Sequence, residues 1–322
     1  MPAFRLGAAA AVALAVLSGP AAAQEPATVA VTAIVEHPSL DAVRDGVRDV
    51  LAENGYTAED GTLEFLFETA QGNPATAVQI ARQFVGLSPD VIVPISTPSA
   101  QAVVAATSEI PVVFSAVTDP LSAELVSELD RPGGNVTGVS DLTPIGEHLA
   151  LIRELVPTAE TLGVPYNPGE ANAVALLGMI RELAPEYGFS VVEAAAPRSA
   201  DVQAAAQSLA GRADAIYVPT DNTIVTAFEA VVAVGRQTGT PVFSGDTDSV
   251  ARGAVASVGF DYYAVGRRTG ELVLRVLAGE DPGQIPVAFA EGSDLVVNPA
   301  AAGAMGVAIP PDVLARAQTV VD

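Results

Sequence analysis

The sequence predicts an α/β fold made of two doubly wound lobes, each built on a parallel sheet. From Ala27 onward, short β-branched apolar runs alternate with longer stretches whose apolar residues recur at helical spacing. Such alternation is typical of parallel sheets with helices on both faces. The two halves also echo each other, because DVIVP at 90–94 and PVVFS at 111–115 recur as DAIYVP at 214–219 and PVFS at 241–244. A repeat of this size favours two similar lobes, and a single (β/α)8 barrel is the structural alternative.

The first half of the chain supplies four strands, each followed by a helix. The strands are expected at Thr28–Val35, Leu63–Glu68, Asp90–Pro94 and Pro111–Ser115, and the helices at Leu40–Asn54, Pro74–Gly86, Pro98–Ser108 and Leu121–Leu129. A glycine-rich turn is expected at Arg131–Gly138, where the first half ends.

The second half restarts the same pattern and then changes its order. Helices are expected at Glu147–Val156, Ala171–Tyr187, Asp201–Ala210 and Ile224–Thr238, and strands at Thr161–Tyr166, Ser190–Ala195, Ala215–Pro219 and Pro241–Ser244. The tail should hold strands at Gly253–Gly259, Ile285–Phe289 and Asp294–Asn298 and helices at Tyr263–Leu277 and Pro310–Ala317.

This order predicts that the chain passes between the lobes three times, which forms a hinge. Lobe one should contain residues 24–140 and 249–284, and lobe two residues 141–248 and 285–322. Within Pro241–Tyr263 the chain crosses between the lobes, and Asp246 is expected to face the cleft. Asp248 and Asp261 are expected to serve the turn and the hinge.

Residues 1–23 have the features of a secretory signal peptide. Arg5 gives a positive start, Leu6–Leu17 is apolar, and Ala21–Ala23 fits cleavage near Ala23. An N-terminal membrane anchor is the alternative, although the apolar run is shorter than the roughly 20 residues that a span needs. The chain has no cysteine, which excludes disulfides and a lipid-modified cysteine. The sequence therefore predicts an exported, periplasmic protein.

Charge and motifs argue against several classes of function. The net charge is −23 and all 15 basic residues are arginine, so binding to nucleic acid or to an anionic membrane surface is disfavoured. The sequence contains no GxSxG, HExxH, GxGxxG or phosphate-loop pattern. His148 is expected on the surface of a helix, and one DxD pair at 246–248 is weak evidence for a metal. An enzyme, a cofactor and a bound metal are therefore not expected.

Polar turns follow the predicted strands, and ligands of open parallel sheets bind beyond the carboxyl ends of strands. Ser96–Ser99 is the clearest turn, since Thr97 is placed to cap a helix with Pro98 at its first position. The free amides and hydroxyls there suit a carboxylate. Across both lobes the candidate ligand-binding residues are Glu36, His37, Ser96, Thr97, Ser99, Thr118, Tyr166, Asn167, Asp221, Asn222 and Asp246.

Three short stretches carry a resemblance to a known family. They are VEHPSLD at 35–41, GFDYY at 259–263 and, most specific of the three, RPGGNVTGVS at 131–140. They resemble the substrate-binding proteins of tryptophan/tyrosine-type ABC importers, over essentially the whole chain after residue 23. The resemblance implies the type I periplasmic-binding-protein fold, in which two Rossmann-like lobes close around a ligand. Family members with known ligands mostly bind aromatic amino acids.

The resemblance also implies roles for residues and partners. In the wider class, serine and threonine turns of lobe one hold the ligand's carboxylate, a role that Ser96, Thr97 and Thr118 match. An acidic residue of lobe two holds the ammonium, a role that Asp246 matches. Glu36 and His37 match the first-turn motif, and Tyr166 and Asp221 the lobe-two turns.

The implied partners are an amino-acid-like ligand and an ABC permease, with the protein itself a monomer. Two alternatives are a periplasmic sensor for a membrane receptor and an exported enzyme. A LacI-type regulator of the same fold is disfavoured by the export signal and by the lack of an N-terminal DNA-binding unit.

Overall fold

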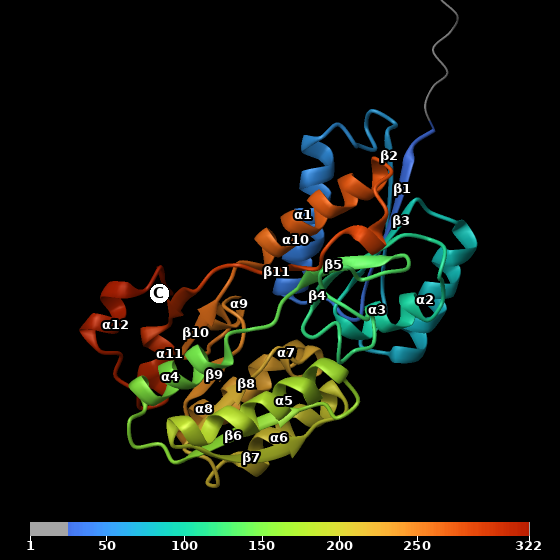
Figure 1. The fold of residues 1–322 in the computed structure, drawn as a ribbon. Helices are drawn as coiled ribbons and strands as arrows, with labels where there is room; N and C mark the ends of the chain where they lie inside the picture. Colours follow the sequence, from blue (N-terminus) through green and yellow to red (C-terminus); the bar gives the residue numbers. More distant parts are fainter. Residues whose placement is uncertain (1–24, 322) are drawn as a thin grey trace, which may run out of the picture.

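The computed structural model describes residues 25–321, and the predicted signal peptide lies outside the described residues. The chain forms two α/β lobes joined by three connecting segments (Figure 1). This arrangement confirms the predicted fold class.

The first lobe is built on a six-stranded sheet in which every neighbouring pair is parallel. In spatial order its strands are β11 (Ala288–Phe289), β5 (Val136–Ser140), β4 (Val112–Val117), β3 (Val91–Ile95), β1 (Ala27–Ala33) and β2 (Leu63–Thr69). The central strands β3, β4 and β5 are buried along their whole length, as expected for parallel strands covered on both faces.

Helices cover both faces of this sheet (Figure 1). They are α1 (Pro38–Glu53) and α10 (Tyr262–Leu277), which pack against each other, and α2 (Pro74–Leu87) and α3 (Thr97–Val104). The pair α1 and α10 approach closely because glycines line the contact: a Cβ at Gly266 would collide with the backbone of Val43. Two segments more than 200 residues apart in sequence therefore form one layer of the first lobe.

The second lobe is built on a four-stranded parallel sheet. Its strands, in spatial order, are β7 (Ser190–Ala195), β6 (Thr161–Tyr166), β8 (Ala215–Val218) and β9 (Val242–Ser244). The helices of this lobe are α4 (Ile145–Leu155), α5 (Ala171–Leu183), α6 (Val202–Leu209), α7 (Asn222–Thr226) and α8 (Phe228–Thr238), with 3-10 turns η1 (Ala184–Tyr187) and η2 (Ser199–Asp201).

The end of the chain adds a small third sheet and further short elements. Its strands are β10 (Ala256–Gly259), antiparallel to β12 (Asp294–Val297), which is parallel to β13 (Thr319–Val320). The remaining elements are α9 (Asp248–Ala251), η3 (Pro282–Gln284), α11 (Pro299–Ala304) and α12 (Pro311–Arg316).

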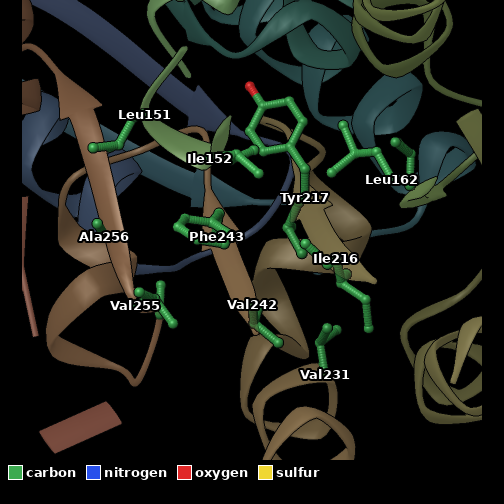
Figure 2. Packing of buried hydrophobic residues seen from close by; sticks show 14 of the residues in the cluster. Leu151, Ile152, Leu162, Ile216, Tyr217, Val231, Val242, Phe243, Val255 and Ala256 are labelled. Carbon is green, nitrogen blue, oxygen red and sulfur yellow. The ribbon is translucent and has the colours of Figure 1, made fainter. Parts of the chain in front are cut away.

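The apolar interior divides into two clusters, one for each lobe. The first joins residues 29–139 with residues 260–287, and the second joins residues 145–258 with residues 295–313. Figure 2 shows Tyr217 and Phe243 of the second cluster, which are among the largest fully buried side chains. Each lobe thus has its own core.

These clusters bear on the predicted lobe boundaries. Residues 250–258 pack in the second core, and β10 pairs with β12, so the assignment of 249–259 to lobe one does not match the packing. Ile285 and Val287 pack in the first core, and β11 extends the first sheet, which likewise differs from their assignment to lobe two. We propose that lobe one comprises residues 25–140 and 260–290, with the connecting segments near residues 141, 259 and 291.

Several predicted elements need correction. Leu121–Leu129 is a series of turns, because Asp119 accepts the amides of Leu121 and Ser122 and Glu124 has a positive φ of 58°. Most of β5 lies where a glycine-rich turn was predicted. The helix expected at 224–238 begins earlier, at Asn222, and is broken at Ala227 into α7 and α8, where the Thr226 hydroxyl bonds back to the Asn222 carbonyl.

His148 is buried, although the sequence placed it at the surface. Only 2% of the residue is exposed, Nδ1 lies 2.6 Å from the Tyr217 hydroxyl, and Nε2 contacts the Val258 carbonyl. Burial lowers the pKa of His148 to about 4, so the ring is neutral at neutral pH. It links α4 to β8 and β10 inside the second core.

Candidate ligand-binding site between the lobes

A small cavity of about 20 Å³ lies between the lobes at the carboxyl ends of their strands. A volume of this size holds about one water molecule, so the lining side chains or the lobes must move apart before an amino acid can occupy the site. The lining residues are His37, Ser39, Leu40, Ser96, Thr97, Ala116 and Thr118 from the first part of the chain, Asp141 and Tyr262 from beside the connecting segments, and Asn172, Thr220, Asp221, Asn222, Val225 and Asp246 from lobe two.

The lobe-one wall is formed by strained backbone and unpaired hydroxyls. Ser96 caps α3 with φ 78° and ψ 157°, and Ala116 has φ 51°, both unusual for residues with a Cβ. The sequence placed the cap one residue later, at Thr97. The Ser96 and Thr97 hydroxyls are buried and find no hydrogen-bond partner within residues 25–321. Beside the free amides of the helix start, these hydroxyls can donate to an anion.

The lobe-two wall is a network of buried carboxylates and backbone amides. Asp221 caps α7 through the Ile224 amide and also accepts the Asn167 amide. Glu170 accepts hydrogen bonds from Asn222 and Thr223 and fixes this turn against the turn after β6. Burial, followed by the charge of Glu170, raises the pKa of Asp221 well above its ordinary value.

Asp246 is buried at the start of α9 and is held by two serines. It accepts the Ser249 amide and hydroxyl, each at 2.8 Å, and the Ser39 hydroxyl at 3.3 Å. Since Ser39 belongs to lobe one, the last bond joins the two lobes directly. Burial raises the pKa of Asp246, and the bonds from Ser249 oppose that shift.

Asp141 is a further buried carboxylate, and the sequence interpretation missed it. It follows β5, and its oxygens accept the Thr118 hydroxyl at 3.2 Å and the Tyr262 hydroxyl at 3.0 Å. Burial raises the pKa of Asp141 to about 6. An acidic residue just after a strand was the signal that could have revealed it, but the strand itself had been read as a turn.

His37 completes the polar lining from the turn after β1. Burial and the positive charge of Arg252 lower its pKa to about 3, so the ring is neutral at neutral pH. Its Nδ1 is buried, with no hydrogen-bond partner in the described chain.

The predicted site residues divide into those that line the cavity and those that do not. His37, Ser96, Thr97, Thr118, Asp221, Asn222 and Asp246 line it. Glu36 is exposed near Arg44, Ser99 is buried behind the wall, and Tyr166 packs against the second core. Asn167 instead lines an outer groove between the lobes, to which Asn222 also contributes. The lining residues that sequence reasoning did not select include Ser39, Asp141, Asn172, Thr220 and Tyr262.

No group of three or more His, Cys, Asp or Glu residues within residues 25–321 could hold a metal ion. No helix in that range has the length and apolar character needed to cross a membrane.

Comparison with known proteins identifies relatives along nearly the whole chain. The family model described as ABC transporter substrate binding protein matches residues 28–321. The tyrosine-binding protein of Clostridioides difficile (strain R20291) is 39% identical over 270 residues, which cover 84% of this chain and 78% of the relative. A conserved domain protein from Vibrio cholerae is 53% identical, with a TM-score of 0.90, covering 91% of this chain and 99% of that structure.

Two other solved structures differ in whether ligand is bound. An ABC domain from Streptococcus pneumoniae in complex with L-Trp is 35% identical, with a TM-score of 0.89, covering 92% of this chain and all of that one. A ligand-free, open substrate-binding protein from Clostridium difficile is 36% identical, but its TM-score is 0.69, with 92% and 99% of the chains covered.

The lobe arrangement of the present structure therefore matches the L-Trp complex better than the open form, at nearly the same sequence identity. The hydrogen bond between Ser39 and Asp246 across the cleft agrees with a closed arrangement. The fold, the cavity between the lobes and the match over residues 28–321 lead to one assignment. This chain belongs to the family of ABC transporter substrate-binding proteins.

Proposed function

We propose that the protein captures a free amino acid, with an aromatic side chain as the favoured class, and delivers it to an ABC importer. The observation that carries this proposal is a set of buried polar atoms that converge on the cavity without partners. They are His37 Nδ1, Ser96 Oγ, Thr97 Oγ1, Asn172 Oδ1 and Thr220 Oγ1. Each unpaired buried group costs about 1–3 kcal/mol, so a polar ligand that pairs with them would stabilise the closed form.

The two walls of the cavity suit the two charges of an amino acid. The start of α3, with the Ser96 and Thr97 hydroxyls, offers donors to the α-carboxylate. The buried carboxylates on the other side, including Asp246, attract the ammonium. Leu40, Val225 and Tyr262 give apolar surface for a side chain.

The relatives favour an aromatic ligand. One is named a tyrosine-binding protein and another was solved with L-Trp, at 39% and 35% identity to this chain. Closure around such a ligand would be a population shift between open and closed lobes.

A thermal-shift screen of the protein without residues 1–23, against L-tryptophan, L-tyrosine, L-phenylalanine and aliphatic amino acids, tests the ligand class. A ligand present at 100 times its Kd adds about 2.7 kcal/mol to the free energy of unfolding. We expect aromatic amino acids to give the largest shift. If no amino acid stabilises the protein, the proposal is wrong.

Calorimetry on Asp246→Asn tests the acidic wall. We expect the variant to lose at least about 2 kcal/mol of binding free energy, because the ammonium would face a neutral amide. Asp130→Asn, at an exposed site of lobe one, is the matched control and should bind normally. Wild-type affinity in the Asp246 variant would remove that residue from the site.

The proposal also includes delivery of the bound amino acid to a permease from the periplasm. The apparent signal peptide and the family membership support it. Uptake of a radiolabelled amino acid into vesicles that contain the cognate permease should depend on added binding protein. Uptake that is independent of the protein would favour a sensory role instead.

A further inference from the structure

The charges that line the cavity are all of one sign. Asp141, Asp221 and Asp246 contribute carboxylates, and no arginine belongs to the lining residues in the described part of the chain. A buried carboxylate without a cation is costly, and proteins normally pair it. The three carboxylates differ in the hydrogen-bond donors and positive charges that the protein itself places around them.

Two of these carboxylates have structural partners. Asp221 accepts hydrogen bonds from the backbone amides of Asn167 and Ile224. Asp246 accepts hydrogen bonds from the Ser249 amide and hydroxyl in α9 and is also stabilised by the positive charge of Arg252. Both side chains would be needed to hold their turns even in the absence of a ligand.

Asp141 differs from these two carboxylates in the groups that surround it. Within residues 25–321, the groups that act on its carboxyl are the Thr118 and Tyr262 hydroxyls and its own backbone, and none of them carries a positive charge. The residue is only 4% exposed, so water does not replace a cation in the closed form. A cavity wall thus carries a buried anion with neutral partners only.

We propose that Asp141 is the main acceptor of the ligand's ammonium group, with Asp246 as a secondary partner that mainly organises its own turn. This inference rests on the proposed function, because it assumes a ligand with a cationic nitrogen. It adds a residue from beside the hinge to a site built from the two lobes.

The position of Asp141 connects ligand binding with the hinge. Asp141 follows β5 on the first connecting segment, and Tyr262 begins α10 just after the second. Their hydrogen bond ties these two segments together beside the cavity. An ammonium held by Asp141 therefore contacts a group that bridges two of the three connections between the lobes, and Tyr262 acts as a positioning residue.

Calorimetry with two ligands tests this assignment. The ligands are the tighter binder of L-tryptophan and L-tyrosine, and its analogue without the amino group. We expect Asp141→Asn to weaken amino-acid binding at least about thirtyfold, more than Asp246→Asn does, and to leave the affinity for the deamino analogue unchanged or higher. Tyr262→Phe should give a smaller loss for the amino acid alone. Asp130→Asn is the control and should bind like wild type.

The outcomes separate this inference from the proposed function. If the wild-type protein binds no amino acid, the proposed function fails. If the wild type binds one and Asp141→Asn binds it within about threefold, or loses both ligands equally, the assignment of Asp141 fails.

A crystal structure of the wild-type complex decides the matter independently of how the variants fold. We expect the ligand nitrogen within hydrogen-bonding distance of the Asp141 carboxylate, about 2.7–3.2 Å. A nitrogen that contacts only Asp246 would overturn the proposal.

Discussion

Ser96 shows that single residues of the cavity can have both a strained backbone and an unpaired polar group. Its backbone has φ 78°, and its buried hydroxyl has no partner in the described chain. Strained backbone of this kind typically costs about 1–3 kcal/mol, is held in place by the surrounding structure, and is concentrated at functional sites. The strain orients the start of α3 toward the cavity, which is where the proposed carboxylate lies.

Substitution of Ser96 by glycine and by alanine separates the strain from the hydroxyl. Both changes remove the hydroxyl, but only glycine adopts this conformation without strain. We expect Ser96→Gly to be more stable than Ser96→Ala by about 1 kcal/mol in urea unfolding, with both binding amino acids more weakly than wild type. Equal stability of the two variants would show that the backbone there is not strained.

At the scale of elements, the helix pair α1 and α10 shows how close packing depends on glycine. Gly266 lies against the backbone of Val43, whereas Gly178 is on an exposed face of α5 with open space around it. Substitution of glycine by alanine should therefore have opposite effects on stability at the two sites.

We expect Gly266→Ala to destabilise the protein by about 2 kcal/mol or more, because the added methyl group forces two helices apart. Gly178→Ala should stabilise it by about 0.5–1 kcal/mol, since alanine is the better helix former. Thermal unfolding of both variants beside wild type measures the difference. A neutral Gly266→Ala would mean that the two helices move apart freely.

Strands and helices were predictable where the local sequence pattern agrees with the tertiary contacts that each element makes. The strands at Thr161–Tyr166 and Ser190–Ala195 were predicted at their observed bounds, and the repeated DVIVP and PVVFS segments correspond to neighbouring strands in each lobe. The strand β5 was missed because Gly133, Gly134 and Gly138 dominate the local pattern, while its pairing with β4 is a long-range contact. Asp141 was missed for the same reason, since its importance depends on that strand and on Tyr262, 121 residues away.

The lobe boundaries were less predictable than the elements. The pairing of β10 with β12 places residues 256–259 in the second lobe, and nothing in the local sequence of β10 specifies that partner. Similarly, β11 joins the first sheet through only two residues. The lobe to which each of these strands belongs depends on which sheet has a free edge to pair with it. That is a property of the whole molecule.

At the scale of the whole molecule, the buried acid at the hinge gives the closed form a dependence on pH. The folded-state pKa of Asp141 is about 6, above its ordinary value of 3.8. A group of this kind contributes stability that is fully present below the unfolded pKa and is lost as pH rises through the folded pKa. If opening of the lobes returns the pKa of Asp141 to its ordinary value, burial of its charge opposes closure at neutral pH by at most about 3 kcal/mol.

The other titratable groups around the cavity shift in known directions. The pKa values of Asp246, Asp248 and Asp221 are also raised by burial, and that of His37 is lowered to about 3. Comparison of wild type with Asp141→Asn between pH 5 and pH 7.5 isolates the contribution of Asp141, because the remaining groups are shared.

We therefore expect ligand-free wild-type protein to be open at pH 7.5 and more closed at pH 5, where Asp141 is largely protonated. Ligand-free Asp141→Asn should be more compact than wild type at pH 7.5 and should change less with pH, because its amide carries no charge to bury. Small-angle scattering measures the radius of gyration in each state, and each 1.4 kcal/mol changes the open-to-closed ratio tenfold. If the two proteins have the same radius at both pH values, Asp141 does not oppose closure, and another feature must keep the unliganded lobes apart.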